Sequence, residues 1–304
     1  MSQAGELLSV GIDVGTTTSQ LVVSRLVLSN QAQGGLVPRI GVAERQVLYR
    51  GEPTLTPLAS EDEIDLAGVR EWIAGEYRNC GIDAARIETG AVIVTGESAR
   101  AANAPVIIDS LAGLAGDFVV TVAGPLVEAQ LAGRGAGAAQ WSAEHYATAV
   151  NVDIGGGSAN VAAFRSGAAC GGSAAMVGGR QVRLDPATGE VLGVKAAGRQ
   201  LAAALDLPDL VIGGRPSLAT LRRFTDAMAE IVVDLVTGTT SPLTELVALT
   251  EPLEIGEPVA RYTVSGGVGG TLSRCPSCGK EALEFSGDPN GSWLKRCYSC
   301  GYTW

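Results

Sequence analysis

The sequence predicts a two-lobed α/β protein that ends in a small cysteine-containing appendage. Two observations predict the lobes: a hydrophobic strand followed by Asp and a glycine-rich or hydroxyl-rich turn occurs at residues 10–21 and again at residues 150–161. Four cysteines in two close pairs near the end of the chain predict the appendage. The expected boundaries are 1–148 for the first lobe, 149–270 for the second lobe and 271–304 for the appendage.

Bulk properties bound the class of protein. A chain of 304 residues, 46% of them hydrophobic, can bury two modest cores. A formal net charge of −10 and an isoelectric point near 4.7 argue against nucleic-acid and anionic-membrane partners, because both would repel an acidic surface. The start of the chain has no basic region before its apolar stretch, and no apolar run reaches the length of about eighteen residues that a membrane span needs. These features predict a cytoplasmic protein.

The first lobe begins with a strand pair. Alternating apolar residues predict a hairpin over residues 8–28 and a further strand over 46–49. Ser60 and Glu63 have the spacing of a capping box, and the apolar residues that follow at helical spacing predict a helix that ends at Gly81.

Strands and helices then alternate. Branched residues predict buried strands over 91–95 and 118–122, and Pro125 suits the first turn of the next helix because its missing N–H has no partner there. The order strand, helix, strand, helix supports an α/β lobe. The glycine-rich stretch 133–138 predicts a flexible crossing between the lobes, in which Arg134 is a solvated linker residue or a phosphate contact.

The second lobe continues the pattern. Strands are expected from residue 158 to 164 and from 168 to 176, followed by a turn over 185–189. Apolar residues recurring every three or four positions predict a long amphipathic helix over 218–238. The only histidine, His145, has no nearby nucleophile or second ligand in the sequence, so a surface or packing role is expected.

The two Asp-Gly turns have the chemistry of phosphate binding. Glycines without Cβ let backbone N–H groups approach a ligand closely, and hydroxyls add donors. A carboxylate beside phosphate is repulsive unless a divalent cation lies between them, so Asp13 and Asp153 are predicted ligands of Mg²⁺, direct or through water. A single Asp-x-Gly turn also occurs in hairpins that bind nothing, and the repeat is what favours a binding site. The predicted phosphate-binding residues are Gly15, Thr16, Thr17, Thr18, Gly155, Gly156, Gly157 and Ser158.

A third element, residues 262–269, is again a strand that runs into glycines, and it suits a nucleoside that needs close backbone approach. In this order the three elements resemble the phosphate-1, phosphate-2 and adenosine motifs of the superfamily that contains actin, heat-shock chaperones and sugar kinases. The resemblance implies an actin-like ATPase fold of the ribonuclease H type, and it implies ATP as ligand. It adds as nucleoside-binding residues Ser265, Gly266, Gly267 and Gly269.

A closer resemblance rests on five segments: Leu8–Thr18, Thr95–Ala99, Gly116–Val120, Ala123–Pro125 and Asn151–Gly157. Together they are similar to the ethanolamine ammonia-lyase reactivating factors, and the resemblance covers residues 6–270. It implies a chaperone-like partner of ethanolamine ammonia-lyase that uses ATP to exchange inactive cobalamin for adenosylcobalamin. It also implies a role in ethanolamine utilisation and association with a bacterial microcompartment.

Glu97 is a further candidate. It follows the strand 91–95 and either caps the next helix or reaches the active cleft. In the superfamily a polar residue near this point helps position the attacking water or hydroxyl, so the resemblance makes Glu97 a catalytic candidate beside Asp13 and Asp153.

The cysteine pairs, Cys275 with Cys278 and Cys297 with Cys300, have the spacing of a four-cysteine zinc ribbon. They predict a structural Zn²⁺, and the alternative is four free thiols on an unfolded tail. Basic and acidic residues balance in this segment, which favours a protein contact or a purely structural role over nucleic-acid binding. The family pattern normally continues beyond the adenosine element, so the change of composition predicts a shortened second lobe joined to a foreign ribbon.

Two other functions remain open from the sequence. One is a small-molecule kinase of the same superfamily, which would need a substrate pocket and a base. The other is a nucleotide-binding protein without turnover, because the second lobe is shortened.

Overall fold

The computed structural model describes residues 5–15, 18–30, 32, 40–60, 63–94, 118–268, 283–287 and 293–297. The chain divides into two compact units, Met1–Gly124 and Pro125–Trp304, and each is considered by itself. Within these described residues, no helix is both long and apolar enough to cross a membrane.

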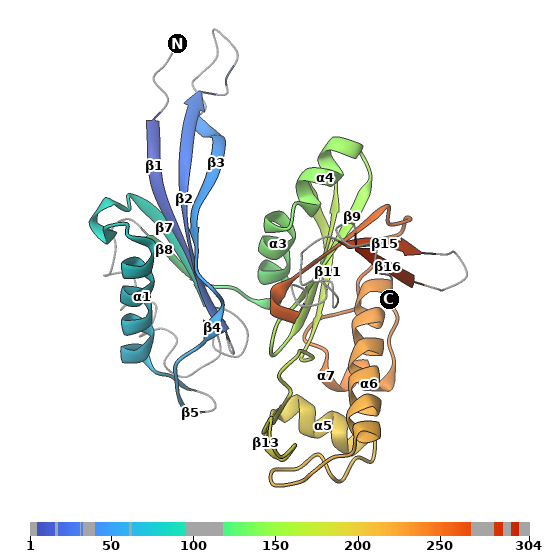
Figure 1. The fold of residues 1–304 in the computed structure, drawn as a ribbon. Coiled ribbons are helices and arrows are strands. Elements are labelled where there is room, and N and C mark those ends of the chain that lie inside the picture. The colour runs from blue at the N-terminus through green and yellow to red at the C-terminus, as the bar shows by residue number, and fades with distance from the viewer. Residues whose placement is uncertain are drawn as a thin grey trace. The chain divides into compact units, whose positions relative to one another are not determined.

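The first unit is built on one mixed sheet with the strand order β3-β2-β1-β7-β8 (Figure 1). Its first three strands are antiparallel neighbours, and β1, β7 and β8 run parallel, with the short β4 pairing with β2. The predicted hairpin and the three predicted strands of this lobe are confirmed. The strands are β1 (Gly5–Val14), β2 (Thr18–Asn30), β3 (Ile40–Arg50), β4 (Thr54–Leu55), β7 (Thr89–Val94) and β8 (Phe118–Val122), with a separate small hairpin of β5 (Leu58–Ser60) and β6 (Glu63–Ile64).

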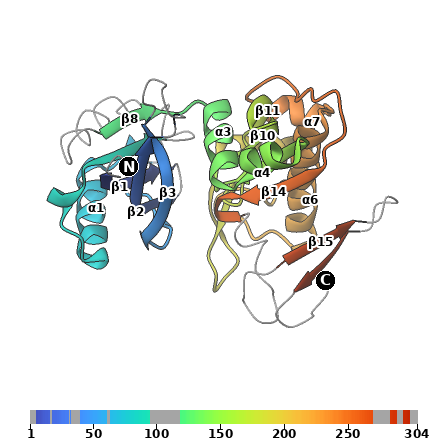
Figure 2. The ribbon, with the colours of Figure 1, turned by 90° about the horizontal axis from the view of Figure 1, so that it is seen from above.

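Helix α1 (Leu66–Cys80) covers one face of this sheet, and it packs on the side chains that β1 points inward, among them Val10, Ile12 and Val14 (Figure 2). The predicted capping box is wrong, because Ser60 and Glu63 lie in β5 and β6. The helix begins instead after Asp65, whose carboxylate accepts the N–H of Ala67 at 3.0 Å. It ends as predicted at Gly81, which has a left-handed φ of 66°. A short 3-10 turn, Ala84–Arg86, follows.

The second unit repeats the topology of the first. Its sheet has the order β11-β10-β9-β14, in which β9, β10 and β11 are antiparallel neighbours and β9 runs parallel to β14. The first unit has the same arrangement in β3-β2-β1-β7. The repeat in the sequence is therefore also a repeat of strand order and direction. The strands are β9 (Thr148–Ile154), β10 (Ala159–Arg165), β11 (Ala168–Ala175) and β14 (Arg261–Ser265).

Helices cover both faces of this second sheet (Figure 1). One face packs against α3 (Pro125–Gly135) and α4 (Ala138–His145), and α6 (Leu218–Thr237) and α7 (Pro242–Val247) lie on the other. Helix α5 (Ala196–Ala204) contributes to the hydrophobic core on the side of α6 and α7. The helices predicted after Pro125 and over 218–238 are confirmed. Ring stacking of His145 on Trp141, with 4.3 Å between centroids, agrees with a packing role for the histidine.

The glycine-rich stretch 133–138 belongs to the second unit, where it forms the junction of α3 and α4. A Cβ on Gly133 would lie 2.3 Å from the ring of Phe164 in β10, so this glycine permits close helix-sheet packing. The prediction of a crossing at this point is therefore wrong. The units divide at Gly124/Pro125, ahead of the expected boundary at 148/149, because α3 and α4 pack on the second sheet.

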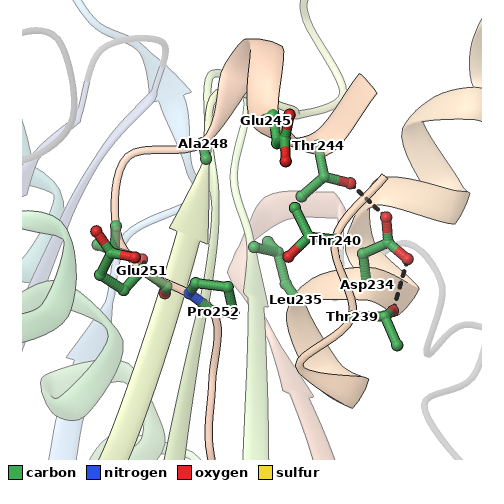
Figure 3. Close-up of a pocket in the computed structure, with 10 residues that line it drawn as sticks. Asp234, Leu235, Thr239, Thr240, Thr244, Glu245, Ala248, Glu251 and Pro252 are labelled. Carbon is green, nitrogen blue, oxygen red and sulfur yellow. Dashed lines mark hydrogen bonds between the residues drawn. The ribbon is translucent and has the colours of Figure 1, made fainter. Parts of the chain in front are cut away.

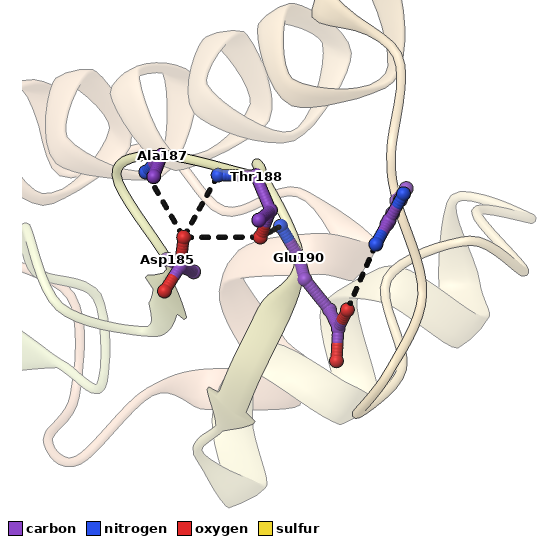
Figure 4. A network of polar contacts seen from close by, with 5 residues as sticks. Asp185, Ala187, Thr188 and Glu190 are labelled. Carbon is purple, nitrogen blue, oxygen red and sulfur yellow. Dashed lines mark hydrogen bonds and ion pairs between the residues drawn. The ribbon is translucent and has the colours of Figure 1, made fainter.

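A small hairpin, β12 (Val182–Leu184) and β13 (Val191–Val194), extends from the second unit. Asp185 organises its turn, because one carboxylate oxygen accepts the N–H groups of Ala187 and Thr188 at 2.9 and 2.8 Å and the Thr188 hydroxyl at 3.0 Å (Figure 4). These bonds lower the pKa of Asp185. The turn predicted over 185–189 is thus confirmed.

Near the end of the chain, β15 (Leu283–Gly287) and β16 (Trp293–Cys297) form an antiparallel hairpin. Cys297 ends β16, while Cys275, Cys278 and Cys300 lie outside the described residues.

Candidate functional site

The two Asp-Gly hairpins close in the same way. The N–H of Gly15 donates to the carbonyl of Thr18 at 3.1 Å, and the N–H of Gly155 donates to the carbonyl of Ser158 at 3.0 Å. Asp13 lies opposite Gln20 across the first hairpin, and Asp153 lies opposite Asn160 across the second. The strands therefore place both predicted acids one residue before the end of the first strand of each hairpin, as the sequence pattern predicts.

The carbonyl oxygens of the three glycines in the second turn face residues 178–181, here called the backing segment. The N–H of Gly179 donates to Gly155 at 3.1 Å, the N–H of Arg180 donates to Gly156 at 2.8 Å, and the side-chain amide of Gln181 donates to Gly157 at 2.7 Å. Among the described residues, the N–H groups of Gly156 and Gly157 have no acceptor. A turn with occupied carbonyls and available N–H groups presents partial positive charge, which suits an anion.

Two glycines let the chain approach this turn closely. A Cβ on Gly178 would lie 2.7 Å from the carbonyl oxygens of Gly155 and Gly156. Gly266 has a φ of 82°, and a Cβ there would lie 2.4 Å from the carbonyl oxygen of Ile154. Residues 266–268, which include the predicted Gly267, continue from β14 into helical backbone. The predicted adenosine element therefore lies directly beside the second turn.

Gln181 was missed by the sequence reasoning. Its fully buried side chain donates to the carbonyls of Gly157 and Met176, at 2.7 and 3.1 Å, and accepts the N–H of Gly198 in the first turn of α5 at 3.1 Å. The same side chain thus connects the second turn to the start of a helix. The available sequence signal was a polar residue two positions after the Gly178-Gly179 pair.

Asp153 is held by a chain of side chains from β9 and β14. The Ser265 hydroxyl donates to Asp153 Oδ1 at 2.6 Å, and Asn151 Nδ2 donates to Ser265 at 2.9 Å. The Thr263 hydroxyl in turn donates to Asn151 Oδ1 at 2.8 Å. The pKa of Asp153 is raised above its ordinary value because the carboxyl group is buried, and the hydrogen bond from Ser265 opposes part of this rise. Ser265, predicted as a nucleoside contact, therefore binds Asp153, while Asn151 and Thr263 were not predicted as site residues.

The first hairpin is supported differently. Thr56 donates to the carbonyl of Gly15 at 2.7 Å and lies 2.9 Å from the buried hydroxyl of Ser19. Gln20 donates to the carbonyl of Gly51 at 2.9 Å. Asp13 is exposed on the sheet face away from α1.

Several predicted site residues lie outside the described residues, and their roles stay predictions: Thr16, Thr17, Glu97, Gly269, Cys275, Cys278 and Cys300. The side chain of Cys297 is also not described. In the part of the chain that is described, no group of three or more His, Cys, Asp or Glu side chains has the arrangement of a metal site.

A separate cavity of about 350 Å³ lies between the end of α6, α7 and residues 248–252 (Figure 3). One carboxylate of its lining, Asp234, accepts a hydrogen bond from the hydroxyl of Thr239 at 2.7 Å and another from that of Thr244. These bonds, chiefly that from Thr244, lower the pKa of Asp234. The carboxylate thereby fixes the connection between α6 and α7, and we assign the cavity no ligand.

The duplicated sheets with matching Asp-Gly hairpins form a two-unit α/β fold with the arrangement that the resemblance to actin-like proteins implies. A solved structure of the Aquifex aeolicus PPX-GPPA enzyme has the same fold, with a TM-score of 0.51 and 15% identity over 88% of this chain and 71% of that one. The family model for ethanolamine utilisation protein EutA matches residues 5–288, and the chain belongs to this family. The match continues beyond residue 270, so the predicted junction is not the limit of the family resemblance.

Two curated relatives are similar to most of this chain. The ethanolamine ammonia-lyase reactivase EutA of Escherichia coli strain K12 is 37% identical over 269 residues, and that of Salmonella typhimurium strain LT2 is 36% identical over the same length. The aligned residues make up 87% of this chain and 56% of each relative. The chain thus spans little more than half the length of these reactivases.

Proposed function

We propose that the chain is the nucleotide-binding part of an ATP-dependent, chaperone-like reactivating factor for adenosylcobalamin-dependent ethanolamine ammonia-lyase. Two relatives that carry the name of ethanolamine ammonia-lyase reactivase support the partner. The second hairpin supports the nucleotide.

The observation that carries the proposal is the second turn. The backing segment 178–181 occupies the carbonyls of Gly155, Gly156 and Gly157. The N–H groups of Gly156 and Gly157 have no acceptor among the described residues, so they are available to phosphate oxygens. In the proposed site the hydroxyls of Thr16, Thr17, Thr18 and Ser158 add donors, and the segment that begins at Gly266 holds the nucleoside.

The two acids fit Mg²⁺. This cation prefers oxygen ligands and accompanies nucleotide phosphates in proteins, and both Asp13 and Asp153 lie one residue before the end of a strand that leads into a predicted phosphate turn. When bound, Mg²⁺ supplies positive charge to the phosphates. We assign Asp13 and Asp153 as its ligands, direct or through water, and Glu97 as the residue that orients the attacking water.

In the proposed mechanism, nucleotide acts on the lyase because it binds one conformation of the chain more tightly than another. A ligand shifts a conformational equilibrium only by as much as it prefers one state over the other. We therefore propose that the chain binds ATP more tightly in one conformation, and that hydrolysis releases this preference and lets inactive cobalamin leave the lyase for adenosylcobalamin.

We further propose that Cys275, Cys278, Cys297 and Cys300 hold a structural Zn²⁺, because four thiolates in two closely spaced pairs suit tetrahedral coordination. Elemental analysis of protein purified under reducing conditions without chelator tests this. Stoichiometric zinc that is lost in Cys297→Ser supports the site, and zinc-free wild-type protein contradicts it.

The function is tested with ethanolamine ammonia-lyase that has been blocked by cyanocobalamin. Adding the chain with ATP, Mg²⁺ and free adenosylcobalamin should restore deaminase activity, and Asp153→Asn should abolish the rescue. Binding of MgATP with neither hydrolysis nor rescue would identify a nucleotide-binding protein without turnover. Hydrolysis that requires a small hydroxylated substrate and ignores the lyase would identify a kinase.

A further inference from the structure

The three hydrogen bonds that lead to Asp153 are all donated in the same direction, toward its carboxylate. Thr263 donates to Asn151, Asn151 donates to Ser265, and Ser265 donates to Asp153, at 2.8, 2.9 and 2.6 Å. Asn151 and Ser265 each donate toward the carboxylate and accept from the residue before them in the series. The final distance of 2.6 Å lies in the range of hydrogen bonds to an ionised carboxylate.

The register of strands β9 and β14 places these hydrogen-bonding side chains next to one another. Asn151 lies opposite Thr263 and Asp153 lies opposite Ser265 in the parallel pair of β9 and β14. The Asn151 side chain is completely buried, and Gly133 of α3 approaches it so closely that a Cβ there would lie 3.2 Å from the Cβ of Asn151. A buried amide retains its orientation through its partners, so both Thr263 and Ser265 hold Asn151 in place.

In the first hairpin the corresponding positions of the parallel strand pair carry different residues. The register there places Asp13 opposite Ile93 and Gly11 opposite Ala91, and these neighbours carry no side-chain donor. The two units nevertheless share strand order, strand direction and the hydrogen bond that closes the turn. The three added polar residues therefore distinguish Asp153 from Asp13.

We propose that Asn151 and Thr263 are positioning residues that, through Ser265, fix the orientation of the Asp153 carboxylate for a hydrated divalent cation. A donor fixed on Oδ1 restricts rotation of the carboxylate and leaves Oδ2 for the cation or its water. Asp153 is then a ligand that its neighbours in β9 and β14 hold in a fixed orientation. The inference rests on the proposed nucleotide site and adds residues that do not themselves contact the ligand.

Thr263→Val is the central variant, because valine keeps the shape of threonine on a strand but cannot donate to Asn151. Thr263→Ser restores the hydroxyl. Thr148→Val is the matched control, since Thr148 lies in the same sheet and its hydroxyl also donates to a side chain, that of Glu257. Ser265→Ala, alone and combined with Thr263→Val, tests whether Thr263 acts through Ser265.

The measurement uses Mn²⁺ as a paramagnetic probe of the cation site. Free Mn²⁺ is followed by electron paramagnetic resonance in the presence of the full chain and the non-hydrolysable ATP analogue AMPPNP. Affinity for metal-free AMPPNP is measured by calorimetry and stability by thermal unfolding.

We expect Thr263→Val to weaken Mn²⁺ binding about 3- to 10-fold, at the lower end of the range for residues that support a metal ligand, and Thr263→Ser to restore it. Affinity for metal-free AMPPNP should not change, and Thr263→Val should add nothing in the Ser265→Ala background. The inference is overturned if Thr263→Val and Thr148→Val lower the melting temperature alike and leave Mn²⁺ affinity unchanged. Wild-type protein that binds AMPPNP neither with nor without metal would overturn the proposed function as well.

Discussion

The side-chain amide of Gln181 donates to the carbonyl oxygen of Gly157 at 2.7 Å, and its own carbonyl accepts the N–H of Gly198 in α5 at 3.1 Å. One buried residue thus joins the second Asp-Gly turn to a helix of the same hydrophobic core. The position of the turn therefore depends on the packing of α5.

Replacing this residue should loosen both contacts. In Gln181→Met the side chain keeps its length, but the carbonyl of Gly157 and the N–H of Gly198 lose their partner. We expect a loss of about 2–4 kcal/mol in the free energy of unfolding, since buried polar groups are left unsatisfied. Urea unfolding measures this loss. Gln140→Met is the control, because Gln140 is exposed on α4 and, among the described residues, its side chain bonds only to Glu144. Equal effects of the two substitutions would contradict the assigned role.

Gly178 should not tolerate a side chain. A Cβ at this position would lie 2.7 Å from backbone atoms of Gly155 and Gly156, which cannot rotate away as a side chain could. We expect Gly178→Ala to destabilise the protein by about 1–3 kcal/mol, the usual range for overpacking, and to weaken binding of ATP. Gly135→Ala is the control, since no described atom lies within 4 Å of a Cβ there. Unaltered calorimetric affinity for ATP in Gly178→Ala would show that the turn is not part of the site.

The two acids should be needed for binding of the magnesium complex of ATP. Asp13→Asn and Asp153→Asn each remove a negative charge that the cation requires, and we expect affinity for MgATP to fall by several-fold to about a hundredfold. Asp185→Asn provides the control, because the Asp185 carboxylate is used within its own turn. Calorimetry that finds the same MgATP affinity in both variants and wild type would exclude this assignment.

The Asp185 turn should weaken in acid. Three hydrogen bonds favour the ionised carboxylate and lower its pKa in the folded state below its unfolded value. Its contribution to stability is therefore complete above the unfolded pKa, about 4, and is lost as the pH falls through the lower folded value. Comparing urea unfolding of wild type and Asp185→Ala between pH 7 and pH 2 should show a difference that shrinks below about pH 4. A stability difference between the two proteins that stays constant across this pH range would contradict the stabilising role of the ionised Asp185.

The sequence predicted correctly those elements that depend on residues close together in the chain, such as turns and amphipathic helices. The paired Asp-Gly turns predicted both hairpins, and the apolar stripe that ends at Gly238 predicted α6. The start of α1 was misplaced because Asp65 competes with Ser60 for the capping position, and short strands take up Ser60 and Glu63. Spacing alone does not decide between two such candidates.

Features that need distant contacts were harder to predict. Gly133 suggests flexibility by composition, yet it is required by the ring of Phe164. The link from Thr263 to Asp153 depends on the register of two parallel strands, and no local pattern fixes that register. The predicted phosphate residues of the second turn are brought together by the structure, whereas Thr16, Thr17 and Glu97 lie outside the described residues.

The parallel pairing of β9 with β14 also has a consequence for the order of folding. The β9–β10 hairpin closes between neighbouring residues, but Asp153 and Ser265 are separated by 112 positions along the chain. Closing so long a loop has a large entropic cost, and the contacts of the intervening helices must offset it. We expect the glycine turn to form early and its carboxylate to acquire a fixed orientation only when β14 docks. Pulsed amide exchange during refolding would then protect β10 before β14, and a folding chain would gain ordered cation binding among its last steps.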